Sequence, residues 1–130
     1  MSDTWIYYQF KMKVCQIPEG YDLGGIEADI GFAPTRIIKA KSKPHIEKHM
    51  AVLESEIFTK EIISEQFTEW LLSIEHLFPR LKQFVEKHNA RLLFSIITQE
   101  KSGGVFGEGI EAQAIKILAD LGAGISWVDN

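Results

Sequence analysis

The segment "ISEQFTEWLLSIEHLFPRLKQFV", residues 63–85, carries the strongest periodic signal in the chain. Its large apolar residues recur at spacings that alternate between four and three positions, as they do along one side of an α-helix. Leu71, Phe78 and Val85 widen this stripe, so we predict one long amphipathic helix whose apolar face is covered by the rest of the fold. The stripe itself consists of Ile63, Phe67, Trp70, Ile74, Leu77, Leu81 and Phe84.

Pro79 lies inside this pattern and lacks the backbone N–H that a helix interior uses, so we predict a kink there. A self-paired coiled coil is the alternative for such a stripe. The run is too short, and its aromatic side chains too bulky, for the regular interlocking of a zipper. We therefore favour a helix whose apolar face is covered by other parts of one domain, residues 1–130.

Residues 5–15 alternate between apolar and mostly polar positions, which predicts a strand lying on a core. Pro18 and Gly20 end it, Asp22 is suited to cap a short helix after it, and Gly31 is suited to end that helix. The core-facing residues of the strand are predicted to be Ile6, Tyr8, Phe10, Met12 and Val14.

Strands are also predicted at 35–41 and 50–55, with a loop at 41–45 between them. "RLLFSIIT", residues 91–98, is apolar on both faces and predicts a central strand covered by a helix. A helix over 110–121 and a strand over 125–128 complete the order β-α-β-β-α-β-α-β. This order predicts an α+β fold, with helices layered on one face of a mostly antiparallel sheet.

Composition indicates an ordinary globular protein, with 45% hydrophobic and 25% charged residues. No apolar run approaches the roughly 20 residues that span a bilayer. Met1 to Thr4 lack the features of a secretory signal, and the single cysteine, Cys15, excludes an internal disulfide. We therefore expect a cytoplasmic protein without a membrane association.

Four stretches span nearly the whole chain in this order: "GFAPTR" (31–36), "VLESE" (52–56), "FTEWLLSIEHLFPRL" (67–81) and "IEAQAIKILADLGAGISWVD" (110–129). Together they resemble a bacterial family known as a domain of unknown function, numbered 4279. The chain departs from the family at Ala51-Val52, where a tryptophan is usual before "LES", and at Val128-Asp129-Asn130, where Asp-aliphatic-Tyr is usual. The resemblance implies an α+β domain and assigns no catalytic or binding residue.

The glycine-rich stretch "SGGVFGEG", residues 102–109, raises the question of a phosphate site. Its glycine order is the reverse of the dinucleotide fingerprint, and no Gly-Lys-Ser/Thr follows it. Glu108 and Glu111 stand where the next helix begins, and their charges would repel a phosphate there. The stretch therefore predicts a connecting loop.

His45 and His49 have the i, i+4 spacing of two helical metal ligands, but no third ligand has a suggestive spacing to them. A solvated loop is the favoured interpretation, and no metal or cofactor is predicted.

The sequence contains no recognisable arrangement of residues for nucleophilic or acid–base catalysis. Cys15 is expected to be an inert thiol, and neither Ser73 nor Ser95 lies in a nucleophile elbow. Glu54 and Glu56 are expected on a solvated strand face. The chain is therefore predicted not to be an enzyme.

Residues 36–49 carry five cations against Glu47, whereas the whole chain has a net charge of -4. The cations are suited either to form an anion-contacting rim or to discourage pairing at a solvated edge strand. Nucleic acid is an improbable partner, because no aromatic residues are interleaved with this strip. The anion-contact candidates are Arg36, Lys39, Lys41 and Lys43.

Two functional hypotheses remain. The first is a non-catalytic protein-binding module, such as an immunity or inhibitor protein that neutralises a basic nuclease toxin. The second is a small-ligand-binding protein or enzyme with a cleft between sheet and helices, beside the strip 36–49. Homo-oligomerisation through the helix stripe or an exposed strand edge is left open. Candidate contacts for a basic partner are Glu61, Glu65, Glu69, Glu108 and Glu111.

Overall fold

The computed structural model describes residues 6–59, 62–100 and 109–129. Its strands are β1 (Ile6–Ile17), β2 (Arg36–Ile38), β3 (His49–Glu54), β4 (Phe58–Thr59), β5 (Arg91–Glu100) and β6 (Gly124–Asp129). Its α-helices are α1 (Ile26–Ile30), α2 (Ile63–Ile74), α3 (Phe78–His88) and α4 (Ala112–Leu121). Two 3-10 turns, η1 (Leu23–Gly25) and η2 (Glu75–Leu77), precede α1 and α3.

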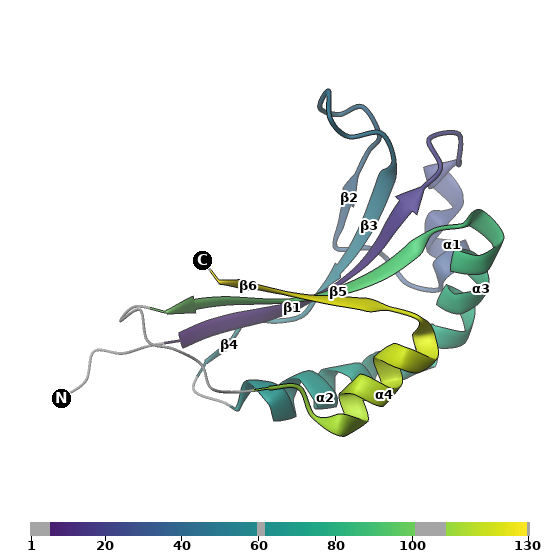
Figure 1. Ribbon diagram of the computed structural model, residues 1–130. Helices are drawn as coiled ribbons and strands as arrows, with labels where there is room; N and C mark the ends of the chain where they lie inside the picture. The colour runs from purple at the N-terminus through teal and green to yellow at the C-terminus, as the bar shows by residue number, and fades with distance from the viewer. Residues whose placement is uncertain (1–5, 60–61, 101–108, 130) are drawn as a thin grey trace.

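The strands form one sheet in the order β2-β3-β1-β5-β6, and β4 adds a short pairing to β1. All these pairs are antiparallel except β5 with β6, which run parallel because α4 crosses over between them. Figure 1 shows α2, α3 and α4 on one side of the sheet. The predicted α+β class and mostly antiparallel sheet are confirmed.

β1 is the central strand, and its alternation places one row of side chains in the core as predicted. Tyr8, Phe10, Met12 and Val14 are almost completely buried. The other row, which includes Lys11 and Lys13, lies on the open face of the sheet. β5 pairs with β1 along its whole length, so Phe94 and Ile96 share the buried face.

An aromatic cluster joins the sheet to α2. The ring of Phe10 lies 5.1 Å from that of Phe67 and 5.6 Å from that of Trp70, measured between centroids. Phe67 also meets Phe94 edge-on at 6.4 Å. Burying such rings stabilises the domain by about 1.5–3 kcal/mol for each side chain, so this cluster forms the centre of the core.

The predicted single long helix is wrong, because α2 and α3 are separate helices joined by η2. The break comes before Pro79, which lies in the first turn of α3. A proline lacks the N–H that would bond to the carbonyl of residue i−4, and its ring clashes with that carbonyl. For Pro79 that residue is Glu75, where α2 has ended and η2 begins.

The short helix after β1 follows the predicted signals, although it begins as η1. The Asp22 carboxylate accepts a hydrogen bond from the Gly24 N–H, and Gly31 ends α1 in the left-handed conformation with φ at 87°. The Arg80 side chain packs on Gly31 and donates to the Ala28 carbonyl at 3.3 Å. These contacts fix α1 beside α3.

Two other predictions need correction. The strand predicted over 35–41 is only Arg36–Ile38, because the chain turns at Lys41 with φ at 63°. β4 was not expected from the sequence, and it adds a strand to the predicted order. The stretch 102–108 lies outside the described residues, so its interpretation as a loop stays a prediction.

Replacing Pro79 with alanine is expected to change the free energy of unfolding by no more than about 1 kcal/mol. The first turn of a helix has no intrahelical partner for its N–H groups, so the proline is tolerated there. The matched control is Gln83→Pro, at an exposed position inside α3, which should cost about 3 kcal/mol or more. Urea unfolding measures both, and equal losses would contradict the assigned position of Pro79.

Candidate functional site

The acidic candidates that the structure describes lie on two neighbouring helices. Glu65 and Glu69 are exposed and one turn apart on the same outward face of α2. Glu111 is the N-cap residue of α4, which packs beside α2 (Figure 1). Glu61 and Glu108 lie outside the described residues.

The outward side of α2 combines carboxylates with exposed aliphatic side chains. Ile62 is 51% exposed and Leu72 is 39% exposed. The sequence from 61 to 79 contains no lysine or arginine. In the part of the chain that the structure describes, Glu65, Glu69 and Glu75 form no ion pair. We call the set Ile62, Glu65, Glu69, Leu72 and Glu75 the α2 surface.

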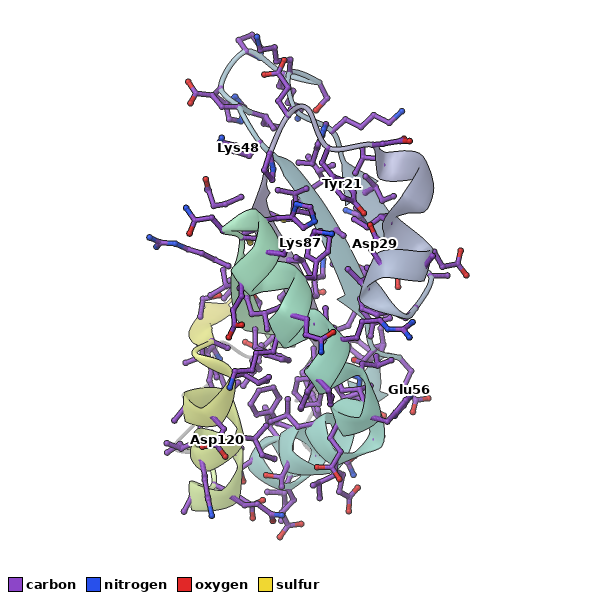
Figure 2. The ribbon with its side chains drawn as sticks, turned by 90° about the vertical axis from the view of Figure 1, so that its right-hand side faces the viewer. Tyr21, Asp29, Lys48, Glu56, Lys87 and Asp120 are labelled. Carbon is purple, nitrogen blue, oxygen red and sulfur yellow. The ribbon has the colours of Figure 1, made fainter. Side chains whose placement is uncertain are left out.

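The adjoining helix α3 has the opposite charge. Arg80, Lys82 and Lys87 are exposed on it, and Glu86 is its exposed acid. Figure 2 shows α3 in front, with Lys87 labelled on it and Asp120 on α4. The helix layer is therefore divided into an acidic part at α2 and a mainly basic part at α3.

The four anion-contact candidates do not share one strand face. Arg36 lies on β2, in register with Val52 of β3, which in turn is opposite Lys13 of β1. Lys39, Lys41 and Lys43 lie in the loop between β2 and β3, because β2 ends at Ile38. Lys41 is 3.5 Å from the Glu19 carboxylate. Arg36 therefore lies on a strand, and the other three candidates lie in the loop that follows it.

A pocket of about 290 Å³ lies beside the strip 36–49. It is lined by Cys15 and Gln16 of β1 and by residues 45–50. A β-bulge forms it, because Val14 pairs with Ala51 and Ile17 with His49, which leaves two residues of β1 opposite one of β3. The pocket lies between a strand and a loop, not between sheet and helices.

Gln16 also lines a second, open pocket, which it shares with Asn89 and Arg91. Gln16 has a φ of 61°, which is uncommon for a residue with a side chain. Arg91 stands opposite Cys15 in the sheet. The sequence did not identify Gln16, Asn89 or Arg91 as candidate site residues, because no residue pattern marks this bulge. The available signal was an arginine at the start of an apolar strand.

The Cys15 thiol is poorly suited to nucleophilic chemistry. Burial raises its pKa, and the Lys13 ammonium lowers it to a smaller extent. Because the thiolate is the nucleophile, a raised pKa leaves less of it at neutral pH. This environment agrees with the expected inert thiol.

His49 is held by two backbone groups and is 8% exposed. Its Nδ1 accepts a hydrogen bond from the Ala40 N–H at 2.8 Å, so its Nε2 donates to the Glu19 carbonyl at 2.9 Å. The interpretation of a solvated loop holds for His45 and is wrong for His49. Neither histidine is in a helix, and no group of three metal-ligating side chains occurs among the described residues.

Ser95 and the carboxylates of β3 have structural partners. The Ser95 hydroxyl is fully buried and lies 2.8 Å from that of Ser126, which links β5 to β6. Glu54 is paired with Lys11 at 3.0 Å. β3 ends at Glu54, so the strand face that Glu54 and Glu56 were expected to share is not formed.

A contact between the Tyr21 hydroxyl and the Asp29 carboxylate joins the connection after β1 to α1. Loss of hydration, the hydrogen bond to Asp29 and the nearby acidic charges raise the pKa of Tyr21. The ring packs edge-on against Phe84, 5.4 Å away between centroids. Tyr21 therefore acts as a structural link between α1 and α3 (Figure 2).

The largest groove among those described has a volume of about 480 Å³ and lies between the start of α3 and the end of α4. Phe78, Pro79, Ile117 and Leu121 supply its apolar lining, and charged side chains border it. In Figure 1 the start of α3 and the end of α4, which line this groove, lie far from the loop between β2 and β3 that carries Lys39 to Lys43. It is thus separate from the basic strip.

Comparisons with models of protein families, with curated proteins and with solved structures find no match for this chain. The resemblance to the bacterial family numbered 4279 therefore stays a prediction. Across the described residues, each helix is too short or too polar to cross a lipid bilayer.

Replacing His49 with alanine is expected to lower the free energy of unfolding by about 1–3 kcal/mol, because the Ala40 N–H and the Glu19 carbonyl lose their partner. His45→Ala is the matched control at an exposed position, with an expected change within about 0.5 kcal/mol. Chemical denaturation measures both. Equal, small effects would show that the His49 contacts contribute little.

Proposed function

We propose that this protein is a non-catalytic, cytoplasmic binding module that neutralises a basic protein, in the manner of an immunity protein against a nuclease toxin. The observation that carries the proposal is the α2 surface. Its three carboxylates have no ion-pair partner among the described residues, and two exposed aliphatic side chains lie among them.

This combination fits a basic protein better than a small ligand. Interfaces have an apolar centre and a polar rim, and Ile62 and Leu72 would provide apolar contact area beside the carboxylates. Carboxylates that face a cationic partner raise the rate of association and select against acidic partners. The basic side chains of α3 border this surface and would help to orient the partner.

The environments of the reactive side chains also support a non-catalytic role. The Cys15 thiol has a raised pKa, and the Ser95 hydroxyl is buried against Ser126. The described structure holds both groups within β1 and β5 of the sheet.

The double charge reversal Glu65→Lys/Glu69→Lys tests the proposal. The binding probe is the product of the neighbouring gene, measured by calorimetry and by rescue of growth on co-expression. We expect the wild type to bind and rescue, and the reversed variant to lose affinity by about 10- to 100-fold, because attraction becomes repulsion.

Glu86→Lys is the matched control, since it makes the same change at an exposed position on α3. It should bind almost as well as the wild type. Absence of both complex and rescue with the wild type would refute the proposal, as would equal losses in the two variants.

A second candidate function is the binding of a small anion, and the pocket beside the strip 36–49 favours it. Lys48 lines this pocket, and Arg91 lines the adjoining one that shares Gln16. Neither cation has an ion-pair partner among the residues that the structure describes. Their charges, with the amide of Gln16, suit a phosphate or carboxylate group.

Thermal unfolding in inorganic phosphate or citrate tests this second candidate. A ligand at 100 times its dissociation constant stabilises the folded state by about 2.7 kcal/mol, so the melting temperature should rise. Arg91→Gln should abolish the rise, whereas Lys116→Gln, at an exposed site on α4, should retain it. A rise of equal size in both variants would exclude a site at Arg91.

A further inference from the structure

His49 joins three segments at one end of the sheet. It is the first residue of β3, and it pairs with Ile17, the last residue of β1. Its buried ring lies between the Ala40 N–H, in the loop after β2, and the Glu19 carbonyl, in the turn after β1. The side chain therefore connects the loop between β2 and β3, residues 39–48, to the turn after β1 (Figure 1).

These two contacts require a neutral imidazole. The Ala40 N–H can only donate, so Nδ1 of His49 must offer a lone pair. The Glu19 carbonyl can only accept, so Nε2 must carry the proton. A protonated ring has an N–H at both positions, and its Nδ1–H would face the Ala40 N–H across the present 2.8 Å contact. Protonation of His49 and its hydrogen bond with Ala40 therefore exclude each other.

The loop 39–48 has internal hydrogen bonds but few polar attachments to its surroundings. Among the described residues, its other polar side-chain contact with the turn after β1 is the ion pair between Lys41 and Glu19, at 3.5 Å. Both side chains are exposed, and ion pairs of this kind contribute little. The loop would thus separate from the turn as a unit if the His49 contacts were lost. Its internal backbone bonds run from Lys41 to Ile46, from Ser42 to Lys39 and from Ile46 to Lys43.

The charges around His49 nearly balance. Two lysines would repel a protonated ring, and two carboxylates would attract it. Among these side-chain types, histidine is the one that ordinarily changes charge between about pH 5 and about pH 8. The conflict at the Ala40 N–H therefore decides how the loop responds to acid. The titratable neighbours are Cys15 of β1, Glu19 of the turn, and Lys41, His45, Glu47 and Lys48 of the loop.

We infer that His49 is an acid-sensitive switch, which holds the loop 39–48 against the turn after β1 when it is neutral and releases the loop when it is protonated. Because the open form can take up the proton without losing the Ala40 bond, opening becomes more favourable as the pH falls. The free energy of closing the loop is fully available in neutral solution and is lost in acid.

Release of the loop would change the cationic end of the sheet. The loop carries four lysines, and its residues 45–48 form one wall of the pocket beside Cys15 and Gln16. Both the cations and this wall would move in mild acid. The inference rests on the two His49 contacts, goes beyond both candidate functions and depends on neither of them.

Nuclear magnetic resonance of the full chain at about pH 7.5 and about pH 5 tests the switch. We expect the His49 ring to be neutral, with its proton on Nε2, at the higher pH and to be protonated at the lower pH. Protection of the Ala40 amide from hydrogen exchange, corrected for the intrinsic effect of pH, should fall by about tenfold or more. The amide of Phe94, in the centre of the sheet, should keep its protection.

His49→Gln should lose this pH response, because a glutamine amide offers an acceptor and a donor but takes up no proton in this range. His45→Gln is the matched control, since it removes the exposed histidine of the same loop, and it should respond as the wild type does. Circular dichroism verifies that both variants fold, and the wild-type measurements decide if they do not.

Four results would overturn the inference. In the wild type they are a His49 ring that stays neutral at about pH 5, or a ring that becomes protonated while the Ala40 amide stays protected. In the variants they are a pH response that persists in folded His49→Gln, or one that disappears in folded His45→Gln.

Discussion

Burial of one face of β1 beneath α2 is the constraint on which the rest of the structure depends. Phe10 lies at the centre of this contact, with Phe67 and Trp70 of α2 around it and Phe94 of β5 touching both α2 rings. Because β1 pairs with β3, β4 and β5, fixing its buried face also fixes the faces of its neighbours. The helices then occupy one side of the sheet, and the charged side chains of β1 stay on the other.

This arrangement separates the surfaces available for function. The acidic side of α2 faces away from the sheet, and the cations near the β1 bulge lie at the far end of β1. The two surfaces differ in chemistry: one has carboxylates among aliphatic side chains, and the other has cations around a small pocket. A basic protein and a small anion would therefore bind at different places.

Much of the fold was predictable from residue patterns, and the errors have physical causes. The alternation of Tyr8 to Val14 correctly identified a buried strand face, and Gly31 correctly marked a helix end. One long helix with a kink at Pro79 was predicted, but a proline disrupts the turn before it, so the chain divides into two helices at η2. His49 was assigned to solvent because its partners, Ala40 and Glu19, are a backbone amide and a backbone carbonyl with no side-chain signature.

The sequence by itself determined the α+β class, the buried face of β1 and the acidic character of residues 61–79, because periodicity and charge are local properties. Only the tertiary structure decided that β5 and β6 run parallel and that Gln16 shares pockets with Lys48 and Arg91. These juxtapositions depend on strand order and on a bulge. Such features arise from packing between distant segments, which no local pattern records.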